Sequence, residues 1–287
     1  VIPAHCENDG VVNYLRGWYK AQGLTQPIYH ARSRPARCEA EAVSRLLHLA
    51  AMAGEAPVYV VHLSSAAGLA EVRKARAQRQ KGVGVETCTQ YLTLTEAAYA
   101  DPQEGLKAVM SPPLRTQADC DALWQGLQDG VIDAVATDHC PFRFAVEKAS
   151  SARVTHRPGP QPGAPGVEER LPVLYSEGVA KGRLSICELV RLLCANPSRL
   201  YGLYPRKGTL QPGADADVVI LDPAKRRTLT HAGLHSAVDY TCYEGMELQG
   251  AIDLVLSRGE VVARDNQFVG KRGAGRYLKR GHSSLAE

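Results

Sequence analysis

Apolar and polar positions follow two alternating patterns along the first half of the chain. Short apolar or β-branched runs predict strands at residues 1–6, 57–65, 83–94 and 131–139. Segments with helical periodicity or helix-forming composition predict helices at residues 36–54, 66–82 and 116–130. Continuous apolar strands alternating with such helices are typical of a parallel sheet covered by helices. Four units at this spacing predict an α/β fold, the second half of a (β/α)8 TIM-like barrel, whose other half we expect upstream of residue 1.

The pattern changes in the second half of the chain. Residues 157–166 form a loop rich in proline and glycine, and a long loop beside a barrel mouth is often functional. Residues 166–182 and 185–203 again predict helices, whereas residues 215–222 and 251–264 predict short strands, the latter with a hairpin turn at Ser-Arg-Gly. We therefore expect a partial barrel over residues 1–207, followed by a small β-sandwich appendage and tail over residues 208–287.

Composition narrows the class of protein. With 34 basic and 30 acidic residues the net charge is only +4, which gives no support for nucleic-acid binding. The most basic stretch, residues 271–280, is better interpreted as a solvated or subunit-contacting tail. No apolar run reaches the length of a membrane-spanning helix. The eight cysteines are scattered without a CxxC pair, which favours reduced thiols in a cytoplasmic protein. The chain begins with Val1, so a preceding targeting signal would not be visible.

Three polar residues share one place in the strand–helix rhythm. His5, His62 and Asp138 each follow the end of a predicted strand. Side chains at the carboxyl ends of barrel strands converge on one axial pocket. Histidine and carboxylate are natural ligands of zinc, and manganese or cobalt would suit them too. The sequence therefore predicts a metal site here, in which Asp138 could also act as a general base.

Each of these residues also has a simpler interpretation. A single histidine after an apolar strand is commonly a hydrogen-bonded core or turn residue, and Asp138 could cap a turn. Their spacing is not a compact metal motif such as HExxH. Because adjacent strand residues point to opposite faces, His139 is expected to be a support residue and Cys140 a packed thiol.

Several longer motifs carry a family resemblance. They are "AHCEN", "VVHLSS", "ETCTQYL", "SPPLR", "ATDHCPF", "GVEERLPVLYSEGV", "NPSRLYGLYPRKGTLQPGADADVVILDP" and the ending "GAGRYLKR". Together, and in this order, they resemble the dihydropyrimidinase/D-hydantoinase family of cyclic amidohydrolases over essentially the whole chain.

The resemblance implies a reaction and a set of roles. Members of the family hydrolyse the ring amide of dihydropyrimidines or 5-substituted hydantoins to N-carbamoyl amino acids, and they are typically homotetramers. Two divalent metal ions, usually zinc, are bridged by a carboxylated lysine. His5 and His62 match ligands of one metal, and Asp138 matches the ligand of the other that also moves the proton. Ser111 matches a serine whose backbone contacts the substrate ring, although before Pro-Pro it could be a turn residue.

Departures from the family pattern limit what the chain can do alone. The HxH motif and the bridging lysine precede "AHCEN" in the family and lie outside these 287 residues. We therefore expect the isolated chain to be inactive. Pro162 stands where the family has an asparagine that contacts the ring through its backbone. Proline keeps the carbonyl but has no N–H, so either one contact to the ring is altered or the loop is aligned differently. The simpler interpretation is a surface loop without a binding role.

Two other functions stay open. A non-catalytic scaffold, like the dihydropyrimidinase-related proteins, keeps this fold but loses metal ligands, and a degenerate gene fragment would also lack upstream motifs. All three ligand positions within the chain are kept, which favours an enzyme. Dihydropyrimidinase, hydantoinase and allantoinase-like activities differ mainly in substrate, and the first half of the barrel would decide among them.

Overall fold

A parallel sheet forms the centre of the first part of the molecule. The structure, a computed structural model, describes residues 1–149 and 161–286. Its parallel strands are β1 (Ile2–Ala4), β2 (Val58–Val60), β3 (Val83–Cys88) and β4 (Ala134–Ala136). They pair in sequence order, with Ala4 opposite Val60 and Cys88 opposite Ala136. The predicted alternation of parallel strands and helices is confirmed.

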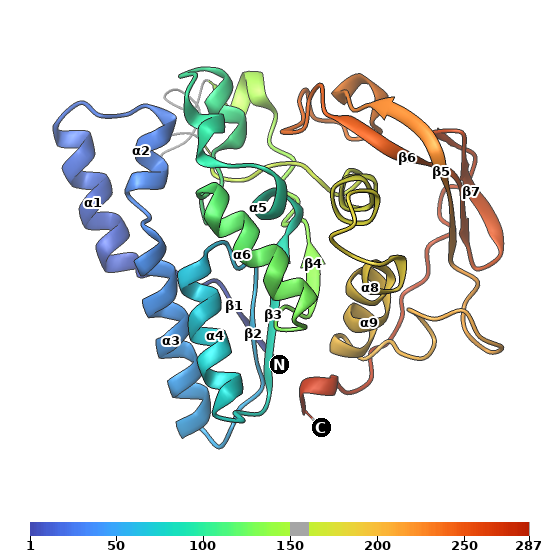
Figure 1. Cartoon of the computed structure of the whole chain (residues 1–287). Coiled ribbons are helices and arrows are strands. Elements are labelled where there is room, and N and C mark those ends of the chain that lie inside the picture. Colours follow the sequence, from blue (N-terminus) through green and yellow to red (C-terminus); the bar gives the residue numbers. More distant parts are fainter. Residues whose placement is uncertain (150–160, 287) are drawn as a thin grey trace.

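The helices α3 (Ala36–Met52), α4 (Ala66–Ala77) and α6 (Gln117–Gln128) cover one face of this sheet (Figure 1). The helices α1 (Asp9–Ala21) and α2 (Pro27–Arg32) lie beyond α3, farther from the strands. α3 packs beside α4, and α4 beside α6. Polar residues cap α4 and α6: Ser65 accepts a hydrogen bond from Gly68 N, and Thr116 and Asp119 form a capping box. α1 and α2 were not predicted, although the Asn8 side chain caps α1.

The predicted strand over residues 83–94 was wrong beyond Cys88. There the chain turns into the short helix α5 (Thr89–Thr93). The helical turn buries Tyr91 and Leu92 together and lets Leu92 O accept a hydrogen bond from Trp124 on α6 at 2.9 Å. A continued strand would point these two neighbours to opposite faces, so tertiary packing overrides the β-branched local pattern.

The second part of the chain starts with two helical runs, as predicted. α7 (Arg170–Leu174) continues into the π-helix η4 (Tyr175–Ala180). α8 (Ile186–Val190), the π-helix η5 (Arg191–Ala195) and α9 (Asn196–Leu200) form the next run. The remaining turns of helix are η1 (Glu96–Tyr99), η2 (Glu104–Ala108), η3 (Phe144–Lys148), η6 (His231–Gly233) and η7 (Ser284–Ala286).

An antiparallel sheet follows these helices. Its strands β5 (Val218–Thr228), β6 (Glu247–Ser257), β7 (Glu260–Arg264) and β8 (Gln267–Phe268) pair in sequence order. The predicted hairpin is confirmed: Arg258 and Gly259 link β6 to β7 and have positive φ values of 51° and 83°, as a two-residue primed turn requires. The described residues contain one sheet here, so the second layer of the predicted β-sandwich stays a prediction.

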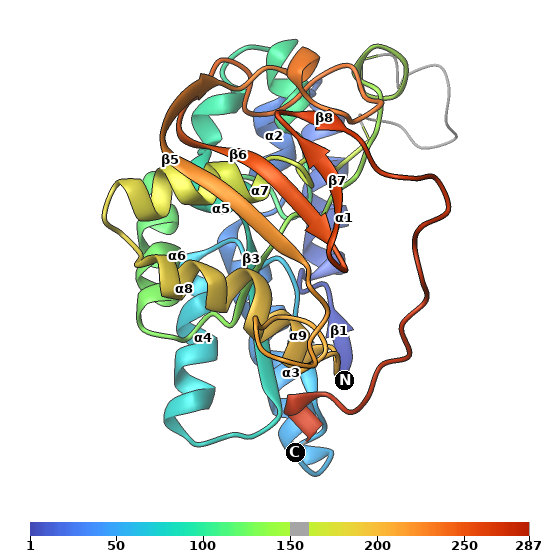
Figure 2. The same cartoon turned by 90° about the vertical axis from the view of Figure 1, so that its right-hand side faces the viewer.

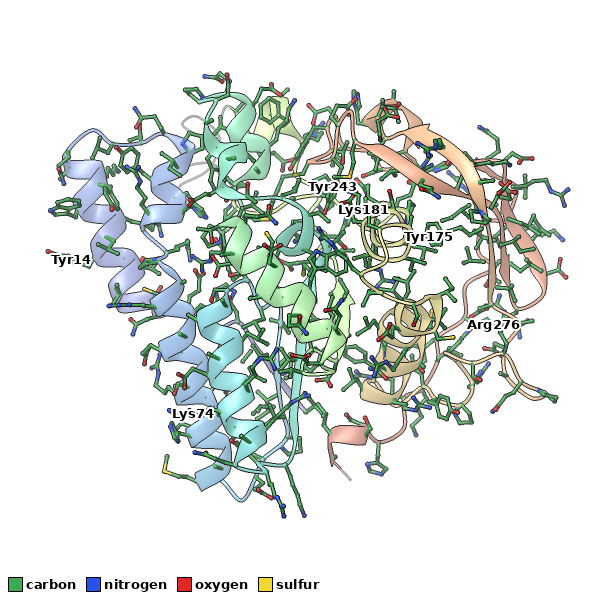
Figure 3. The ribbon with its side chains drawn as sticks, viewed as in Figure 1. Tyr14, Lys74, Tyr175, Lys181, Tyr243 and Arg276 are labelled. Carbon is green, nitrogen blue, oxygen red and sulfur yellow. The ribbon has the colours of Figure 1, made fainter. Side chains whose placement is uncertain are left out.

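The antiparallel sheet packs against the helical runs that precede it through η4. The ring of Tyr175 lies against Gly250 of β6, where an added Cβ would approach it to 2.6 Å (Figure 3). Figure 2 shows the chain running from the antiparallel sheet back along the molecule, so that both termini lie at the same end. There Gly281 N donates to Gly202 O at 2.8 Å. By contrast, Tyr14 of α1 projects outward and is 70% exposed.

Sequence analysis led to expectations about the cysteines and about membrane-spanning helices. All eight cysteines lie within the described residues and are free thiols, as predicted. Among the helices of the described residues, none is long and apolar enough to cross a membrane.

Candidate active site

Three predicted site residues lie at one edge of the parallel sheet. His5 directly follows β1, whereas His62 and Asp138 each come two residues after β2 and β4. Because the strands are parallel, their carboxyl ends meet at the same edge. The fold therefore brings together three residues that are up to 133 positions apart in the sequence (138 − 5 = 133).

The two histidines face each other. His5 Nδ1 lies 3.0 Å from His62 Nε2, and the rings meet edge to face with centroids 4.7 Å apart. Two nitrogens bound to one tetrahedral zinc at about 2.0–2.1 Å lie about 3.3 Å from each other. The pair is therefore spaced like two ligands of a single metal ion.

The backbone at two of these residues adopts an unusual conformation. His62 has φ 41° and Asp138 has φ 47°, both in the left-handed region. This region costs a residue with a side chain about 1–2 kcal/mol. Neighbouring bonds hold the chain there: Leu63 N donates to Glu86 O at 2.8 Å, and the Gln90 side chain donates to Thr137 O at 3.1 Å. Such conformations cluster at functional sites, which supports a role for this edge.

The electrostatic environment keeps His62 neutral. Burial, together with the charge of a protonated His5, lowers its pKa to about 4, while the Asp138 carboxylate opposes the shift. At pH 7 the imidazole is therefore uncharged. A neutral imidazole has a free nitrogen lone pair, which is the form that binds metal.

Glu7 orients His5 from the other side. Its Oε2 accepts a hydrogen bond from His5 Nε2 at 2.8 Å and forms an ion pair with Arg34. Burial alone would raise the pKa of Glu7, but the His5 hydrogen bond and the Arg34 charge hold it below its ordinary value. A proton on Nε2 leaves Nδ1 free to face His62, the carboxylate–histidine arrangement common behind metal ligands. Sequence analysis missed Glu7, although it lies two residues after His5.

Glu39 of α3 supports the turn that follows His62. Its carboxylate accepts hydrogen bonds from Ser64 N at 2.9 Å, Ser64 Oγ at 2.8 Å and the Ser65 hydroxyl. Arg115 donates to Ser64 Oγ at 3.1 Å. This network fixes the turn that follows His62. Ser64 and Ser65 belong to the motif "VVHLSS", but no sequence pattern linked these serines to Glu39.

Asp138 does not join the histidines in a complete metal cluster. Its charge acts on the pKa of His62, but within the described ranges no group of three His, Cys, Asp or Glu side chains is placed to hold a metal ion. Two imidazole nitrogens are a suitable but incomplete donor set, since zinc takes four ligands. The residues present therefore fit part of a metal site.

Ser111 lies in a turn after Met110, and His30 of α2 supports this turn. His30 Nε2 is 2.8 Å from Met110 O and 3.3 Å from Ser111 Oγ. The close carbonyl requires that His30 Nε2 carries a proton and donates. Burial, together with the positive charge of Arg34, lowers the pKa of His30 to about 4. His30 is thus a neutral support for the turn, and sequence analysis did not single it out.

The depressed pKa of His30 predicts a pH dependence of stability. An unfolded histidine binds a proton near pH 6.5, whereas folded His30 resists protonation until about pH 4. As the pH falls from 6.5 toward 4, the unfolded state gains protons and the free energy of unfolding decreases, by up to about 1.4 kcal/mol per pH unit. His30→Gln, which keeps an N–H donor for Met110 O, is expected to flatten this slope in urea unfolding curves. His48→Gln on the exposed face of α3 is the control, and equal slopes for His30→Gln and the wild type would contradict the assignment.

Pro162 is exposed, but the buried residues 163–166 that follow it are hydrogen-bonded to neighbouring segments. Gly163 N donates to Val109 O at 3.0 Å. Gly166 N donates to His139 Nδ1 at 3.1 Å, so His139 supports this segment, as the alternation of side chains predicted. Cys140 is half-buried against Gly163. Residues 163–166 are thus bonded to Val109 on one side and to His139, the residue after Asp138, on the other.

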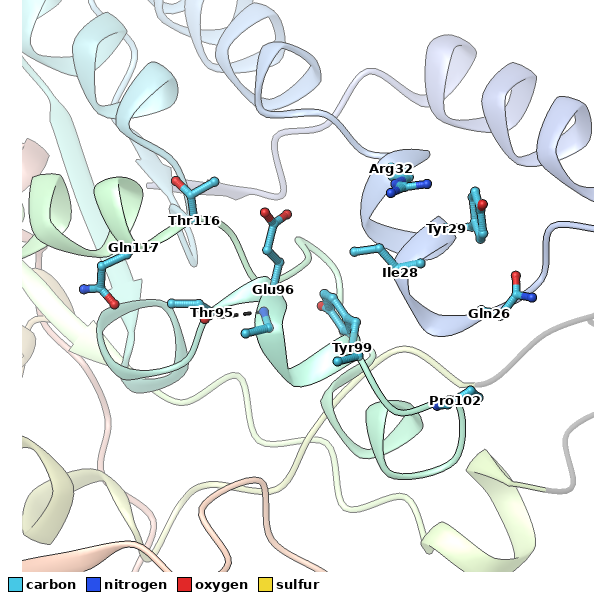
Figure 4. Close-up of a pocket in the computed structure, with 12 residues that line it drawn as sticks. Gln26, Ile28, Tyr29, Arg32, Thr95, Glu96, Tyr99, Pro102, Thr116 and Gln117 are labelled. Carbon is cyan, nitrogen blue, oxygen red and sulfur yellow. Dashed lines mark hydrogen bonds between the residues drawn. The ribbon is translucent and has the colours of Figure 1, made fainter.

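A groove of about 720 Å³ lies elsewhere, between α2 and η1 (Figure 4). Residues that line it include Tyr29, Arg32, Glu96 and Tyr99. It contains none of the five predicted site residues, so the strand-end histidines, and not this groove, define the candidate site.

Comparison with known proteins agrees with this geometry. The model of the amidohydrolase family matches residues 13–262. The chain belongs to the amidohydrolase family. The match covers the parallel sheet from β2 onward and most of the antiparallel sheet, and it includes His62, Ser111 and Asp138.

Curated relatives of this amidohydrolase include D-phenylhydantoinases from several Escherichia coli strains. The one from strain O1:K1 is 49% identical over 280 residues, which is 96% of this chain but 59% of the relative. The chain thus spans about three fifths of the length of the curated relatives it matches.

Solved structures of similar amidohydrolases share the fold. The dihydropyrimidinase from Brevibacillus agri has a TM-score of 0.93 at 42% identity, covering 98% of this chain and 60% of that one. The L-hydantoinase from Arthrobacter aurescens has a TM-score of 0.86 at 33% identity, covering 97% and 60%. The predicted resemblance to the dihydropyrimidinase/D-hydantoinase family is confirmed.

Proposed function

We propose that this chain forms the second half of a TIM-like barrel in a metal-dependent hydrolase that opens a cyclic amide, a dihydropyrimidine or a 5-substituted hydantoin, to an N-carbamoyl amino acid. In this proposal residues 1–207 belong to the barrel and residues 208–287 to a β-sandwich and tail. The observation that carries it is the 3.0 Å approach of His5 Nδ1 to His62 Nε2 at the carboxyl edge of the sheet. The named relatives supply the class of substrate.

The metal ligands follow from that pair. His5 and His62 would hold one divalent ion, and Asp138 a second, with zinc as the expected metal and a carboxylated lysine outside this chain as the bridge. Such ions, when bound, polarise the amide carbonyl and lower the pKa of water. Glu7 keeps His5 oriented through the Nε2 hydrogen bond.

Asp138 would handle the proton. Its side chain is exposed at the edge of the sheet and acts electrostatically on His62, so it can face both water and substrate. It would accept the proton of the attacking water and transfer it to the ring nitrogen as the C–N bond breaks. An amide nitrogen is a poor leaving group unless protonated, so this transfer completes ring opening.

Ser111 and Pro162 would bind the ring. The Ser111 backbone would contact the ring amide, and Pro162 can offer only its carbonyl because it has no N–H. The cyclic amide is then the one small-molecule partner we propose, in a cytoplasmic homotetramer.

The test uses the full-length gene product beside the isolated 287-residue chain. We expect the full-length protein to bind about two metal ions per chain and to open dihydrouracil or 5-phenylhydantoin, and the isolated chain to do neither. Metal content is measured by mass spectrometry and ring opening by loss of absorbance. A folded full-length protein with no metal and no turnover would support the scaffold alternative, and an active isolated chain would contradict the partial barrel.

A further inference from the structure

A lysine outside the predicted site is almost completely buried beside it. Lys148 ends η3, and the whole residue is 1% exposed. Its ammonium donates hydrogen bonds to three backbone carbonyls, those of Lys107 at 3.0 Å, Val109 at 2.9 Å and Gly163 at 2.6 Å. A buried ammonium is costly unless hydrogen bonds satisfy it, so this arrangement has to be built by the surrounding chain.

The three carbonyls belong to the two segments proposed to bind the ring. Lys107 and Val109 lie just before Ser111, and Gly163 directly follows Pro162. Val109 O accepts from the lysine and also from Gly163 N at 3.0 Å. The ammonium therefore clamps the two segments to each other by their backbones.

Residues 163–166 are also hydrogen-bonded to the segment that carries Asp138. Cys140 N donates to Ala164 O at 2.9 Å, and Gly166 N donates to His139 Nδ1. Residues 163–166 are thus bonded on one side to the lysine and on the other to the residues that follow Asp138. Lys148 lies at the centre of contacts that join all three parts of the site.

The charge of the lysine is compatible with this role. Burial lowers its pKa to about 8, while Cys242 and Cys140 oppose the shift. Near neutral pH the Lys148 side chain is therefore protonated in most molecules and has three N–H donors. The Tyr240 ring, whose centroid is 5.5 Å away, adds a cation–π contact.

We propose that Lys148 is a positioning residue for the substrate ring, which sets the separation between the Ser111 turn and the Pro162 segment. This rests on the proposed hydrolysis of cyclic amides. The carbonyls that accept from Lys148 belong to the two ring-binding segments, so the lysine acts on where the ring is held. Interactions that position the ring equally in the ground and transition states affect KM more than kcat.

The test is Lys148→Met in the full-length gene product, which removes the donors and leaves an unbranched apolar side chain that is one atom shorter. We expect kcat/KM to fall by up to about 100-fold, the factor to which an unsatisfied buried hydrogen-bonding group on the ring corresponds. The loss should lie mainly in KM, with bound metal unchanged. The preference between the six-membered ring of dihydrouracil and the five-membered ring of a hydantoin should also weaken, because the spacing of the two segments is no longer fixed.

Lys181→Met is the matched control, because that lysine also lies at the end of a π-helix but forms an exposed ion pair with Glu177 (Figure 3). It should leave kcat and KM unchanged. Lys148→Gln, which retains two N–H donors, is expected to fall between the wild type and Lys148→Met.

Three outcomes would overturn the positioning role. The first is a wild-type KM and ring preference in Lys148→Met, and the second is a loss in this variant that is confined to kcat and metal content. The third is failure of both Lys148→Met and Lys148→Gln to fold, which would assign the lysine to stability alone. Absence of turnover in the wild type would instead reject the proposed hydrolysis, so the two failures are distinguishable.

Discussion

Asp138→Asn in the full-length gene product is expected to slow ring opening by at least about 1,000-fold, because general acid–base catalysis contributes about 10²–10⁴ and a metal ligand is weakened as well. Asparagine has the same shape as aspartate but cannot accept and return a proton at neutral pH. It also tolerates the left-handed backbone of residue 138, with φ 47°, so the turn should be preserved. The loss should therefore appear in kcat without a large change in melting temperature.

Asp121→Asn provides the control for this change. Asp121 lies on the exposed face of α6 and accepts a hydrogen bond from the Gln117 side chain at 3.0 Å, remote from the strand ends. The same loss of one carboxylate should leave turnover unchanged there. Normal kcat and metal content in Asp138→Asn would show that this aspartate only caps its turn, which was the simpler interpretation of the sequence.

The placement of Asp138, His5 and His62 was predictable because each ends a recognisable apolar strand. Once the strands are parallel, their carboxyl ends meet at one edge, whatever the intervening helices contribute. The mutual distance and orientation of the two rings were not predictable, since they depend on the local backbone at His62 and on the Glu7 hydrogen bond.

Supporting residues were missed for a different reason. Lys148, Glu39 and His30 act through backbone groups and hydroxyls 15 to 80 positions away, and no local pattern encodes those partners. A charged residue among apolar neighbours looks like any surface residue until the fold buries it. The error over α5 has the same origin, because packing against α6 decided a segment whose local composition favoured a strand.

Glu39 shows how strongly such a residue can support the site. It is 1% exposed and accepts hydrogen bonds from the backbone and hydroxyl of Ser64 and from the hydroxyl of Ser65. Burial raises its pKa, while Arg115 and the serine hydrogen bonds oppose that rise. Gly68 lets α4 approach, since a Cβ there would lie 3.0 Å from Glu39 Oε2. The carboxylate therefore fits closely between α3 and α4.

Glu39→Ala is expected to lower the free energy of unfolding by about 3–5 kcal/mol, the usual cost of removing one partner from a buried charged network. The change removes one of the negative charges that act on the buried Arg115 and leaves the donors of Ser64 and Ser65 without their acceptor. Denaturant unfolding of the full-length gene product measures the loss. Glu41→Ala on the same helix is the control, since the Glu41 side chain is 45% exposed and pairs with Arg45 at the surface, where the effect should stay below about 1 kcal/mol.

Because the Ser64 turn directly follows His62, any Glu39 variant that folds should also bind metal more weakly than Glu41→Ala. Equal stability and equal metal affinity in the two variants would show that the network neither stabilises the protein nor positions His62.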